Sequence, residues 1–201
     1  MSRRSFLKLF STLATGHFLG PRWTWAHSEK LQNWAGNLEY GTESVYSAKS
    51  AEQVQEFLRK TNRLKVLGTR HCFNSIADSK RQFISLKEMD QIVHLDPVAH
   101  SVTIEAGMTY GRLCPILDSK GWALHNLASL PHISIAGACA TATHGSGETN
   151  GNLATAVSGF EIVNAAGEIR SLSRLYTSRL KYFLRFIIIP RDTSQCVQTE
   201  S

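Results

Sequence analysis

The first clear helical periodicity in the chain follows residue 50. Val54, Phe57 and Leu58 are apolar at positions i, i+3 and i+4, which places them on one face of a helix. Ser50 precedes them as an N-cap, and Gln53 follows Ser50 at the spacing of a capping box. The pattern therefore predicts a helix that begins directly after Ser50.

A second helix is predicted in "YGRLCPILDSKGWAL", residues 110–124. Leu113, Ile116 and Leu117 share one face, and Gly121 is the expected C-cap. Because proline lacks the N–H group that a helix interior uses, Pro115 is compatible only with the first turn of this helix.

Short strands surround the helices. Residues 66–67 form an apolar pair that ends at Gly68, and residues 102, 104 and 106 alternate as a half-buried strand after a turn at Asp96 and Pro97. In "GFEIVNAAGEIRSL", residues 159–172, apolar positions flank an "NAAGE" turn, which predicts a hairpin. Because helices and strands mix without a regular βαβ rhythm, the expected fold class is α+β.

Composition and charge narrow the function classes. The 201 residues are 42% hydrophobic and 19% charged, a globular composition with room for one ample domain or two small ones. The net charge of +6 divides into +4 for residues 1–26, −1 for residues 27–170 and +3 for residues 171–201. A near-neutral body with basic ends lacks the clustered patch that binds phosphate backbones, so we expect no nucleic-acid partner.

The four cysteines, Cys72, Cys114, Cys139 and Cys196, form no CxxC pair, which argues against a structural zinc site. Three of them lie beside apolar residues, so buried free thiols are predicted, with a disulfide as the alternative.

The N-terminus has the features of an export signal. Its apolar stretch of about 11 residues would rise roughly 16 Å as a helix, far short of the roughly 30 Å of a bilayer core. "SRRSFLK", residues 2–8, resembles the twin-arginine motif, so residues 1–26 are predicted to be a signal peptide cleaved after Ala26. We expect export to the periplasm or the cell exterior, with membrane contact only through this signal. The alternative is a basic N-terminus without regular structure.

"LGTRHCFNSIADS", residues 67–79, places His71 directly after a Gly-Thr-Arg turn. Three roles are open for this histidine: a buried structural residue, a metal ligand, or a participant in cofactor chemistry. A metal role is disfavoured because His125, His132 and His144 lack the i, i+4 spacing of a helical zinc site. A serine hydrolase is disfavoured because the chain has no GxSxG. Trp34 and Phe73 are expected to pack in the core or against loops.

The densest run of small residues lies in "LASLPHISIAGACATATHGSGETNGNLATAVSG", residues 127–159. Small side chains let a backbone approach a ligand closely and turn its N–H groups toward an anion such as a pyrophosphate. Neither GxGxxG at a helix start nor GxxxxGK[ST] occurs, so composition alone leaves a tight structural loop equally open.

Together, "VLGTRHCFNSIADS" and "ASLPHISIAGACATATHGSG" resemble the vanillyl-alcohol-oxidase type of flavoprotein, which has a PCMH-type FAD-binding domain. Within it they resemble the alditol and xylitol oxidases and the gulonolactone-type aldonolactone oxidases. The resemblance implies an α+β FAD-binding domain of two small α/β subdomains with FAD between them. It covers residues 33–173, so the domain is expected to be truncated, followed by a divergent basic and apolar tail at residues 174–201. A frame shift would explain that tail; a membrane-surface helix is the alternative.

The resemblance also assigns residues. The loop matching residues 66–71 wraps the FAD pyrophosphate in the family, and a histidine at the position of His71 is bonded covalently to the flavin. Ser129 would be the catalytic residue, near the flavin ring and the substrate hydroxyl. Arg70 would have an orienting role rather than bind the phosphate directly. The implied cofactor-binding residues are Gly68, Thr69, Arg70, His71, Asn74, Ser129, Ser134, Gly137, Thr141, Ala142, Thr143, His144 and Ile162, the last in the segment 159–163 against the FAD.

The implied function is FAD-dependent oxidation of the CH–OH group of a sugar alcohol or aldonolactone. Hydride would pass to covalently bound flavin, and dioxygen is the expected electron acceptor. No metal is implied. The alternative is a truncated remnant that binds FAD weakly or not at all, because the residues that hold the substrate in the family lie beyond the part that this chain resembles.

Overall fold

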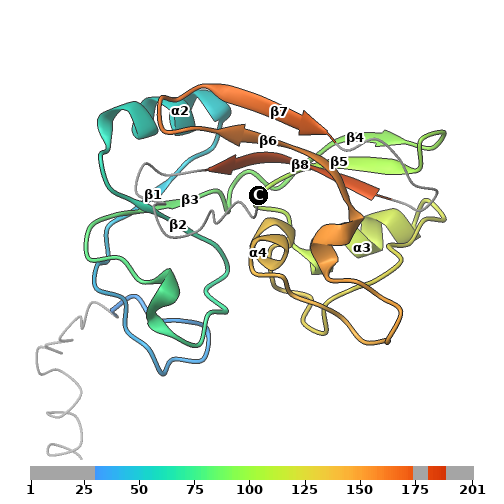
Figure 1. Cartoon of the computed structure of the whole chain (residues 1–201), viewed down its shortest axis with the longest axis horizontal. Helices are drawn as coiled ribbons and strands as arrows, with labels where there is room; N and C mark the ends of the chain where they lie inside the picture. Colours follow the sequence, from blue (N-terminus) through green and yellow to red (C-terminus); the bar gives the residue numbers. More distant parts are fainter. Residues whose placement is uncertain (1–29, 174–180, 189–201) are drawn as a thin grey trace, which may run out of the picture.

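The computed structural model describes residues 30–173 and the backbone of residues 181–188, and it contains two β-sheets (Figure 1). The smaller sheet has the order β1–β3–β2, with both strand pairs parallel. Its strands are β1 (Val45–Ser47), β2 (Lys65–Leu67) and β3 (Phe83–Ser85). Helix α2 (Ala51–Lys60) makes the connection from β1 to β2.

The larger sheet has the order β4–β5–β8–β6–β7. Its strands are β4 (Ile92–Asp96), β5 (Ser101–Glu105), β6 (Val157–Val163), β7 (Ile169–Ser173) and β8 (Lys181–Ile188). The pairs β4–β5 and β6–β7 are antiparallel, whereas β8 runs parallel to both of its neighbours, β5 and β6. The sheet therefore consists of two hairpins joined through a central strand.

The remaining elements lie between β5 and β6 in the sequence, apart from one turn of 3-10 helix after β2. They are α3 (Tyr110–Asp118), α4 (Ile135–Ala140), η2 (Leu153–Ala156) and, after β2, η1 (Ser75–Ala77). In Figure 1, α3 and α4 lie on one side of the larger sheet. The mixture of parallel and antiparallel strands with segregated helices confirms the α+β fold class.

Local sequence signals account for helix α2. The Ser50 hydroxyl accepts a hydrogen bond from the Gln53 N–H, and the Gln53 side chain accepts one from the Lys49 N–H at 2.9 Å. Val54 and Leu58 are buried, which confirms the predicted apolar face. Both the cap and the face come from residues within one or two turns of each other, which is why the sequence pattern is sufficient here.

Helix α3 shows two predictions to be wrong. Pro115 lies in the second turn of the helix rather than in the first. Leu113 and Leu117 are 0% and 1% exposed, and burying two leucines contributes roughly 3 to 6 kcal/mol. That gain offsets the ~3 kcal/mol cost of an interior proline. The predicted C-cap, Gly121, is also wrong, because the helix ends earlier and its C-cap is Ser119. Gly121, with φ +75°, lies in the turn after the helix, where the Trp122 N–H donates to the Leu117 carbonyl.

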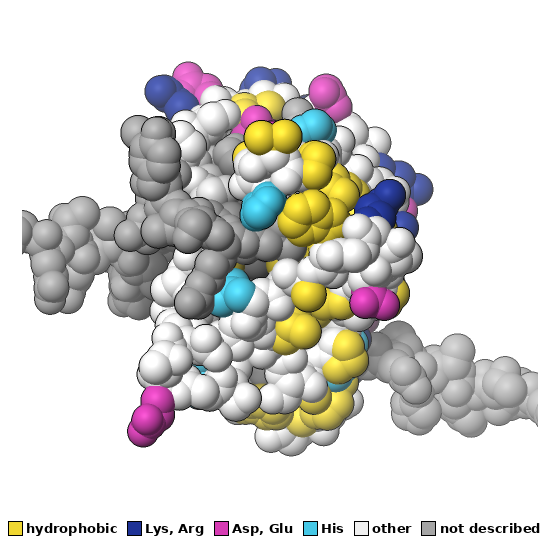
Figure 2. All heavy atoms as spheres, turned by 90° about the vertical axis from the view of Figure 1, so that its right-hand side faces the viewer, with side chains coloured by type: hydrophobic (Ala, Val, Ile, Leu, Met, Phe, Trp, Pro, Cys, Tyr) yellow, Lys and Arg dark blue, Asp and Glu magenta, His cyan; other side chains and the backbone are white. Residues whose placement is uncertain are grey.

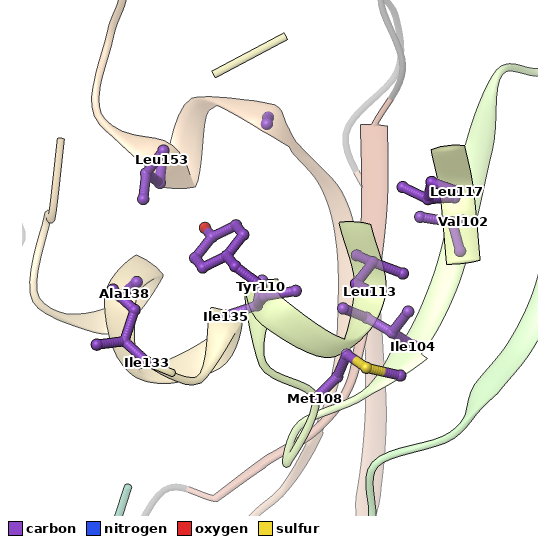
Figure 3. Packing of buried hydrophobic residues seen from close by; sticks show 11 residues of the cluster. Val102, Ile104, Met108, Tyr110, Leu113, Leu117, Ile133, Ile135, Ala138 and Leu153 are labelled. Carbon is purple, nitrogen blue, oxygen red and sulfur yellow. The ribbon is translucent and has the colours of Figure 1, made fainter. Parts of the chain in front are cut away.

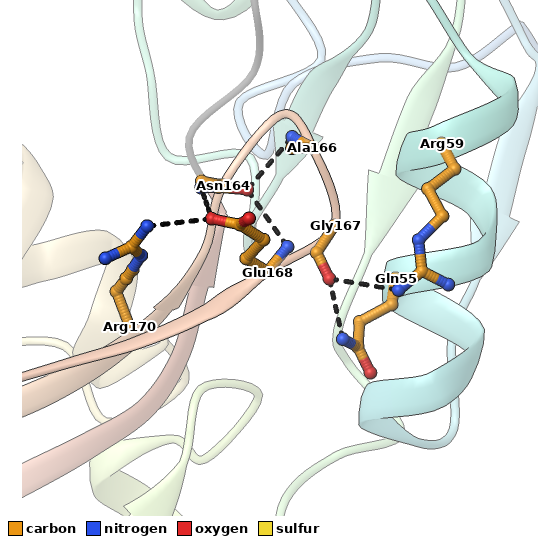
Figure 4. A network of polar contacts seen from close by, with 7 residues as sticks. All are labelled: Gln55, Arg59, Asn164, Ala166, Gly167, Glu168 and Arg170. Atoms are coloured by element: carbon orange, nitrogen blue, oxygen red, sulfur yellow. Dashed lines mark hydrogen bonds and ion pairs between the residues drawn. The ribbon is translucent and has the colours of Figure 1, made fainter.

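The predicted turns and the predicted hairpin are present. The Asp96 carboxylate accepts hydrogen bonds from the N–H groups of Val98 and Ala99, which hold the pKa of Asp96 below its usual value. Asn164 organises the β6–β7 turn in the same way, because its side-chain oxygen accepts from the N–H groups of Ala166 and Glu168 (Figure 4).

The β6–β7 turn also joins the two halves of the fold. Gly167 presents its carbonyl oxygen to the Gln55 side chain at 2.6 Å and to the Arg59 guanidinium at 3.4 Å, both on α2 (Figure 4). Gly167 has φ +76°, and a Cβ there would lie 2.8 Å from Arg59 Nε. A glycine is required at this position by both the backbone conformation and the close approach of α2.

The main core lies between the larger sheet and helices α3 and α4 (Figure 3). Figure 3 shows Tyr110 and Leu113 of α3 pointing toward the residues of β5 and α4. The buried members of this cluster are Val102, Ile104, Met108, Tyr110, Leu113, Leu117, Ile133, Ile135, Ala138, Leu153 and Ala156. A second cluster packs α2 against both sheets, through Val54, Ile84 of β3 and Val163 of β6.

Cys72, Cys114 and Cys139 are free but only partly buried, so the prediction of buried thiols is wrong in degree. Cys114 of α3 and Cys139 of α4 pack against the main buried cluster, whereas Cys72 lies in a loop. Burial is nevertheless sufficient to raise the pKa of the Cys114 thiol. Cys196 lies outside the described residues, as do the predicted signal peptide and most of the predicted tail.

Within that tail, residues 181–188 form strand β8, so a surface helix is not the structure of this segment. The run of apolar residues is placed between two other strands, the position in which continuous rather than alternating apolar character is typical.

Hydrophobic side chains also reach the surface. Figure 2 shows them gathered on the end of the molecule that carries α3 and the β4–β5 hairpin. Val98 in the β4–β5 turn is 92% exposed, and the nearby His100 ring meets Trp122 edge-on at 5.1 Å. In residues 30–173 and 181–188, no helix has the length and the apolar character that crossing a bilayer requires.

Candidate functional site

The two stretches singled out in the sequence meet in the structure. The Thr69 hydroxyl accepts a hydrogen bond from the Ser134 N–H at 3.3 Å. A Cβ on Gly68 would lie 3.5 Å from the Ser134 hydroxyl, and one on Gly137 would lie 2.7 Å from the same atom. Gly68, Ser134 and Gly137 thus lie together at one junction, and at Gly137 a side chain would come closer to Ser134 than ordinary contact allows.

The loop formed by residues 69–73, the cofactor loop, keeps its amide groups available. Among the hydrogen bonds of the described residues, the N–H groups of residues 69–73 donate to no protein acceptor. Arg70 adopts a left-handed backbone conformation, with φ +64°. A left-handed residue within a loop can turn successive N–H groups toward one side, an arrangement that binds anions. This loop therefore fits a diphosphate such as that of FAD.

His71 is held in place by two other rings. Its imidazole stacks on the Trp34 indole with ring centroids 4.5 Å apart, and its Nε2 makes a short contact with His132 Nε2. Only one of two facing ring nitrogens can carry a proton in such a contact. Burial and the neighbouring His132 both lower the pKa of His71, which favours a neutral imidazole.

Trp34 and Asn33 contact the residues around His71, and sequence reasoning did not place them there. Trp34 is 53% exposed and stacks on both histidines rather than packing in the core. Asn33 is 4% exposed and donates from its side chain to the Cys72 carbonyl. The available signal was an asparagine–tryptophan pair close before the first strand, but nothing local to it indicates contact with residues almost forty positions later.

Other predicted residues lie around the junction. Thr141, Ala142, Thr143 and His144 form the turn that follows α4, where the Thr141 hydroxyl contacts the Gly137 carbonyl at 3.0 Å and the Thr143 hydroxyl at 3.1 Å. Ala142 has φ +52°, and the His144 ring contacts the Gly145 carbonyl. Asn74 caps η1 by accepting from the Ile76 N–H. The Asn74 side chain is thus engaged in the local turn.

The structure does not bring Ser129 and Ile162 into contact with His71 through any interaction of the described residues. Ser129 is exposed at the edge of a shallow pocket of about 340 Å³, which it shares with Tyr110, Cys114 and Pro131 among others. Ile162 is 8% exposed on β6, within the larger sheet. In residues 30–173, no group of three or more histidine, cysteine or acidic side chains is placed to hold a metal ion.

Comparison with known proteins identifies the domain. The sequence pattern of the FAD binding domain family matches residues 42–173. The chain is 38% identical over 144 residues to an alditol oxidase of a Streptomyces species, covering 70% of this chain and 34% of that protein. It is 32% identical over 148 residues to L-gulonolactone oxidase of Bos taurus, covering 72% of this chain and 34% of the relative. The chain thus spans about a third of the length of these relatives.

Solved structures show the same fold. Cholesterol oxidase from B. sterolicum aligns with a TM-score of 0.61 at 18% identity, over 71% of this chain and 31% of the other. A xylooligosaccharide oxidase from Myceliophthora thermophila aligns with a TM-score of 0.60 at 18% identity, over 71% and 32%. A matching family pattern, a matching fold and the junction of the two glycine-containing stretches agree, and the chain belongs to the FAD-binding domain family of vanillyl-alcohol-oxidase-type flavoproteins.

Proposed function

We propose that this chain is the FAD-binding part of an oxidoreductase that oxidises the CH–OH group of a sugar alcohol or an aldonolactone. The observation that carries the proposal is the junction itself. There, a loop with free amide groups meets the Gly137 segment beside a histidine whose pKa is lowered. The substrate class is supported by the names of the two relatives, an alditol oxidase and an L-gulonolactone oxidase.

The chain's own residues would hold FAD in two ways. The N–H groups of residues 69–73 would donate to the diphosphate, and the missing side chains of Gly68 and Gly137 would let the cofactor lie close to the backbone. The Arg70 guanidinium donates to the Gln32 carbonyl at 2.9 Å, so its contribution is to shape the loop. When bound, the flavin supplies the acceptor for hydride from the substrate carbon.

His71 is proposed as the covalent anchor. The bond would replace one C–H bond of the flavin 8α carbon and the N–H bond of the neutral ring by one C–N bond, which would release two protons and two electrons. Dioxygen, the electron acceptor that we also propose, would take up the electrons. A ring nitrogen can attack only when its lone pair is free, and the lowered pKa of His71 keeps that form populated at neutral pH.

The proposal has two further elements. Ser129, exposed at its pocket, would contact the substrate hydroxyl. The twin-arginine-like residues 2–8 would direct the protein out of the cytoplasm after folding around its cofactor. The alternative proposal is a remnant that binds FAD weakly or not at all.

The decisive experiment is an absorption spectrum of acid-precipitated protein after expression with ample FAD. We expect flavin absorption to stay with the wild-type chain and with His94→Ala, an exposed histidine on β4, but to be lost from His71→Ala. A colourless wild-type precipitate together with no FAD binding before precipitation would favour the remnant. Colour retained in His71→Ala would place the covalent bond elsewhere.

A further inference from the structure

Residues 31–40 form a small hairpin, here called the N-terminal hairpin, directly before the sheets begin. The Tyr40 N–H donates to the Leu31 carbonyl at 2.8 Å, and Gln32 pairs with Glu39 in an isolated antiparallel bridge. Leu31 and Leu38 pack against a buried cluster that includes Tyr40 and Phe83. The hairpin is therefore fixed to the smaller sheet through its apolar side.

The hairpin's other side holds the cofactor loop through its carbonyl groups. The Trp34 N–H donates to the Arg70 carbonyl at 2.9 Å, and the Asn33 side chain donates to the Cys72 carbonyl at 3.1 Å. In return, the Arg70 guanidinium donates to the Gln32 carbonyl. These three bonds flank His71 on both sides. They use the loop's acceptors and leave its N–H donors unengaged.

Asn33 fixes the geometry of these contacts between the N-terminal hairpin and the cofactor loop. Its side-chain amide donates to Asn37 Oδ1 at 2.8 Å as well as to the Cys72 carbonyl, and its oxygen accepts from the N–H groups of Asn37 and Leu38. Every hydrogen-bonding position of the buried side chain is therefore used. A fully satisfied buried amide fixes the geometry around it, since any displacement leaves a polar group unpaired.

Trp34 then fixes the His71 ring. The indole lies against His71 at 4.5 Å with 26° between the ring planes and against His132 at 5.3 Å with 21°. Phe73 meets the His71 ring edge-on at 6.2 Å. The charged or titratable side chains near the ring are those of His132, Arg70 and Cys72, and of these His132 contacts it directly. The indole covers one face of His71 and keeps water from it.

The matched family pattern begins at residue 42, so the hairpin precedes the residues that this pattern covers. We propose that the N-terminal hairpin is a positioning element, in which Asn33 fixes the cofactor loop and Trp34 orients His71 toward the flavin. This inference rests on the proposed attachment of FAD through His71. Neither Asn33 nor Trp34 is a catalytic residue in it, because each acts through the cofactor loop.

The test compares Trp34→Ala, Trp34→Phe and a matched control, Trp122→Ala, in the full chain. Trp122 also contacts a histidine, His100, but lies away from the junction. Two quantities are measured: the pKa of His71 from its imidazole NMR signals, assigned with His71→Gln, and the rate at which added FAD becomes stable to acid. Noncovalent FAD affinity is measured in parallel.

We expect Trp34→Ala to raise the pKa of His71 toward its ordinary value and to slow covalent incorporation roughly tenfold or more, with FAD affinity little changed. The slowing should be greatest at acidic pH, where a higher pKa leaves fewer neutral rings. Trp34→Phe, which can still stack, should restore most of the rate, and Trp122→Ala should match the wild type.

The outcomes separate the two proposals. If wild-type protein never retains flavin, covalent attachment fails, and the pKa of His71 in Trp34→Ala still decides whether the hairpin positions the ring. A folded Trp34→Ala protein with the wild-type pKa and the wild-type rate would overturn the positioning role. If Trp34→Ala does not fold, Trp34→Leu carries the same test, because leucine keeps apolar volume without a ring to stack.

Discussion

The cofactor loop and the stretch from Ser134 to Gly147 meet at one junction, but their backbones are used differently. In the cofactor loop, the carbonyls of Arg70 and Cys72 are engaged, while the N–H groups of residues 69–73 donate to no acceptor among the residues that the structure describes. In the second stretch, the N–H groups of Ser134, Ala138 and Thr143 already have acceptors in the chain. The first region is prepared to bind an anion, and the second is a packed frame behind it.

The difference separates two meanings of small residues. The second stretch has the higher density of glycine and alanine, yet most of that density serves close packing: a Cβ on Gly145 would lie 2.4 Å from the Leu127 carbonyl oxygen. In the cofactor loop, Gly68 has ordinary contact distances around its missing side chain. In the second stretch, the small residues therefore serve mainly close packing. In the cofactor loop, the backbone N–H groups are the feature that indicates a ligand.

The largest effect should come from closing space in the frame. Gly145→Ala would place a methyl group 2.3 Å from Asn126 Oδ1 and 2.4 Å from the Leu127 carbonyl, so we expect a loss of about 3 kcal/mol of unfolding free energy. Gly68→Ala, the matched control in the cofactor loop, should cost well under half of that. Urea unfolding of both variants measures the difference, and equal losses would contradict the distinction between frame and loop.

The next largest effect should come from releasing the cofactor loop. Asn33→Ala leaves the N–H groups of Asn37 and Leu38 and the Cys72 carbonyl without their partner, which should cost roughly 2 to 3 kcal/mol. FAD affinity should fall along with stability. Asn62→Ala, at an exposed position, is the control for thermal melting and FAD titration. An unchanged melting temperature in Asn33→Ala would mean that the cofactor loop keeps its conformation without Asn33.

A smaller effect is expected at Arg70, where strain and a hydrogen bond oppose each other. Arg70→Ala keeps the left-handed backbone and loses the bond to the Gln32 carbonyl, so it should destabilise the fold by about 1 kcal/mol. Arg70→Gly loses the same bond but relieves a strain of about 1 kcal/mol, and it should lie closer to the wild type. If glycine is the more harmful substitution in urea melts, the strain is absent.

The smallest effect should be the contribution of His71 to the pH dependence of stability. Because the pKa of His71 is lowered in the folded chain, the unfolded chain binds more protons between that value and its own, near 6.5. Stability should therefore rise with pH through this window and be fully present above it. The dependence of the unfolding free energy on pH should be small, because the His71 ring is partly exposed. His71→Gln should remove this dependence, whereas His94→Gln should leave it unchanged.

Much of the fold follows from local signals. Four features each depend on residues only a few positions apart. They are the cap at Ser50, the apolar face of α2, the turn at Asp96 and the β6–β7 turn that contains Gly167. Pro115 was misplaced because burial of Leu113 and Leu117 against a distant sheet outweighs the local penalty. Local patterns are reliable until long-range burial opposes them.

The site was less accessible to sequence reasoning. Family resemblance indicated the two stretches. It did not indicate the contacts of His71, which meets His132, 61 positions later in the sequence, and Trp34, which lies well before it. No spacing rule connects these three rings, since they approach through loops rather than along one helix or strand. The hydrogen bonds from Asn33 to the cofactor loop were also missed, because the sequence around an asparagine does not show whether its side chain is buried.

The position of β8 has a consequence for how this protein is made. The β4–β5 and β6–β7 hairpins pair neighbouring segments, but β5 and β6 are hydrogen-bonded to each other only through a strand synthesised afterwards, with Ser101 opposite Lys181. Until residues 181–188 leave the ribosome, a nascent chain carries two unsatisfied strand edges, which are sites for aggregation. Folding of the larger sheet is therefore tied to the synthesis of β8, which follows the other four strands of this sheet in the chain.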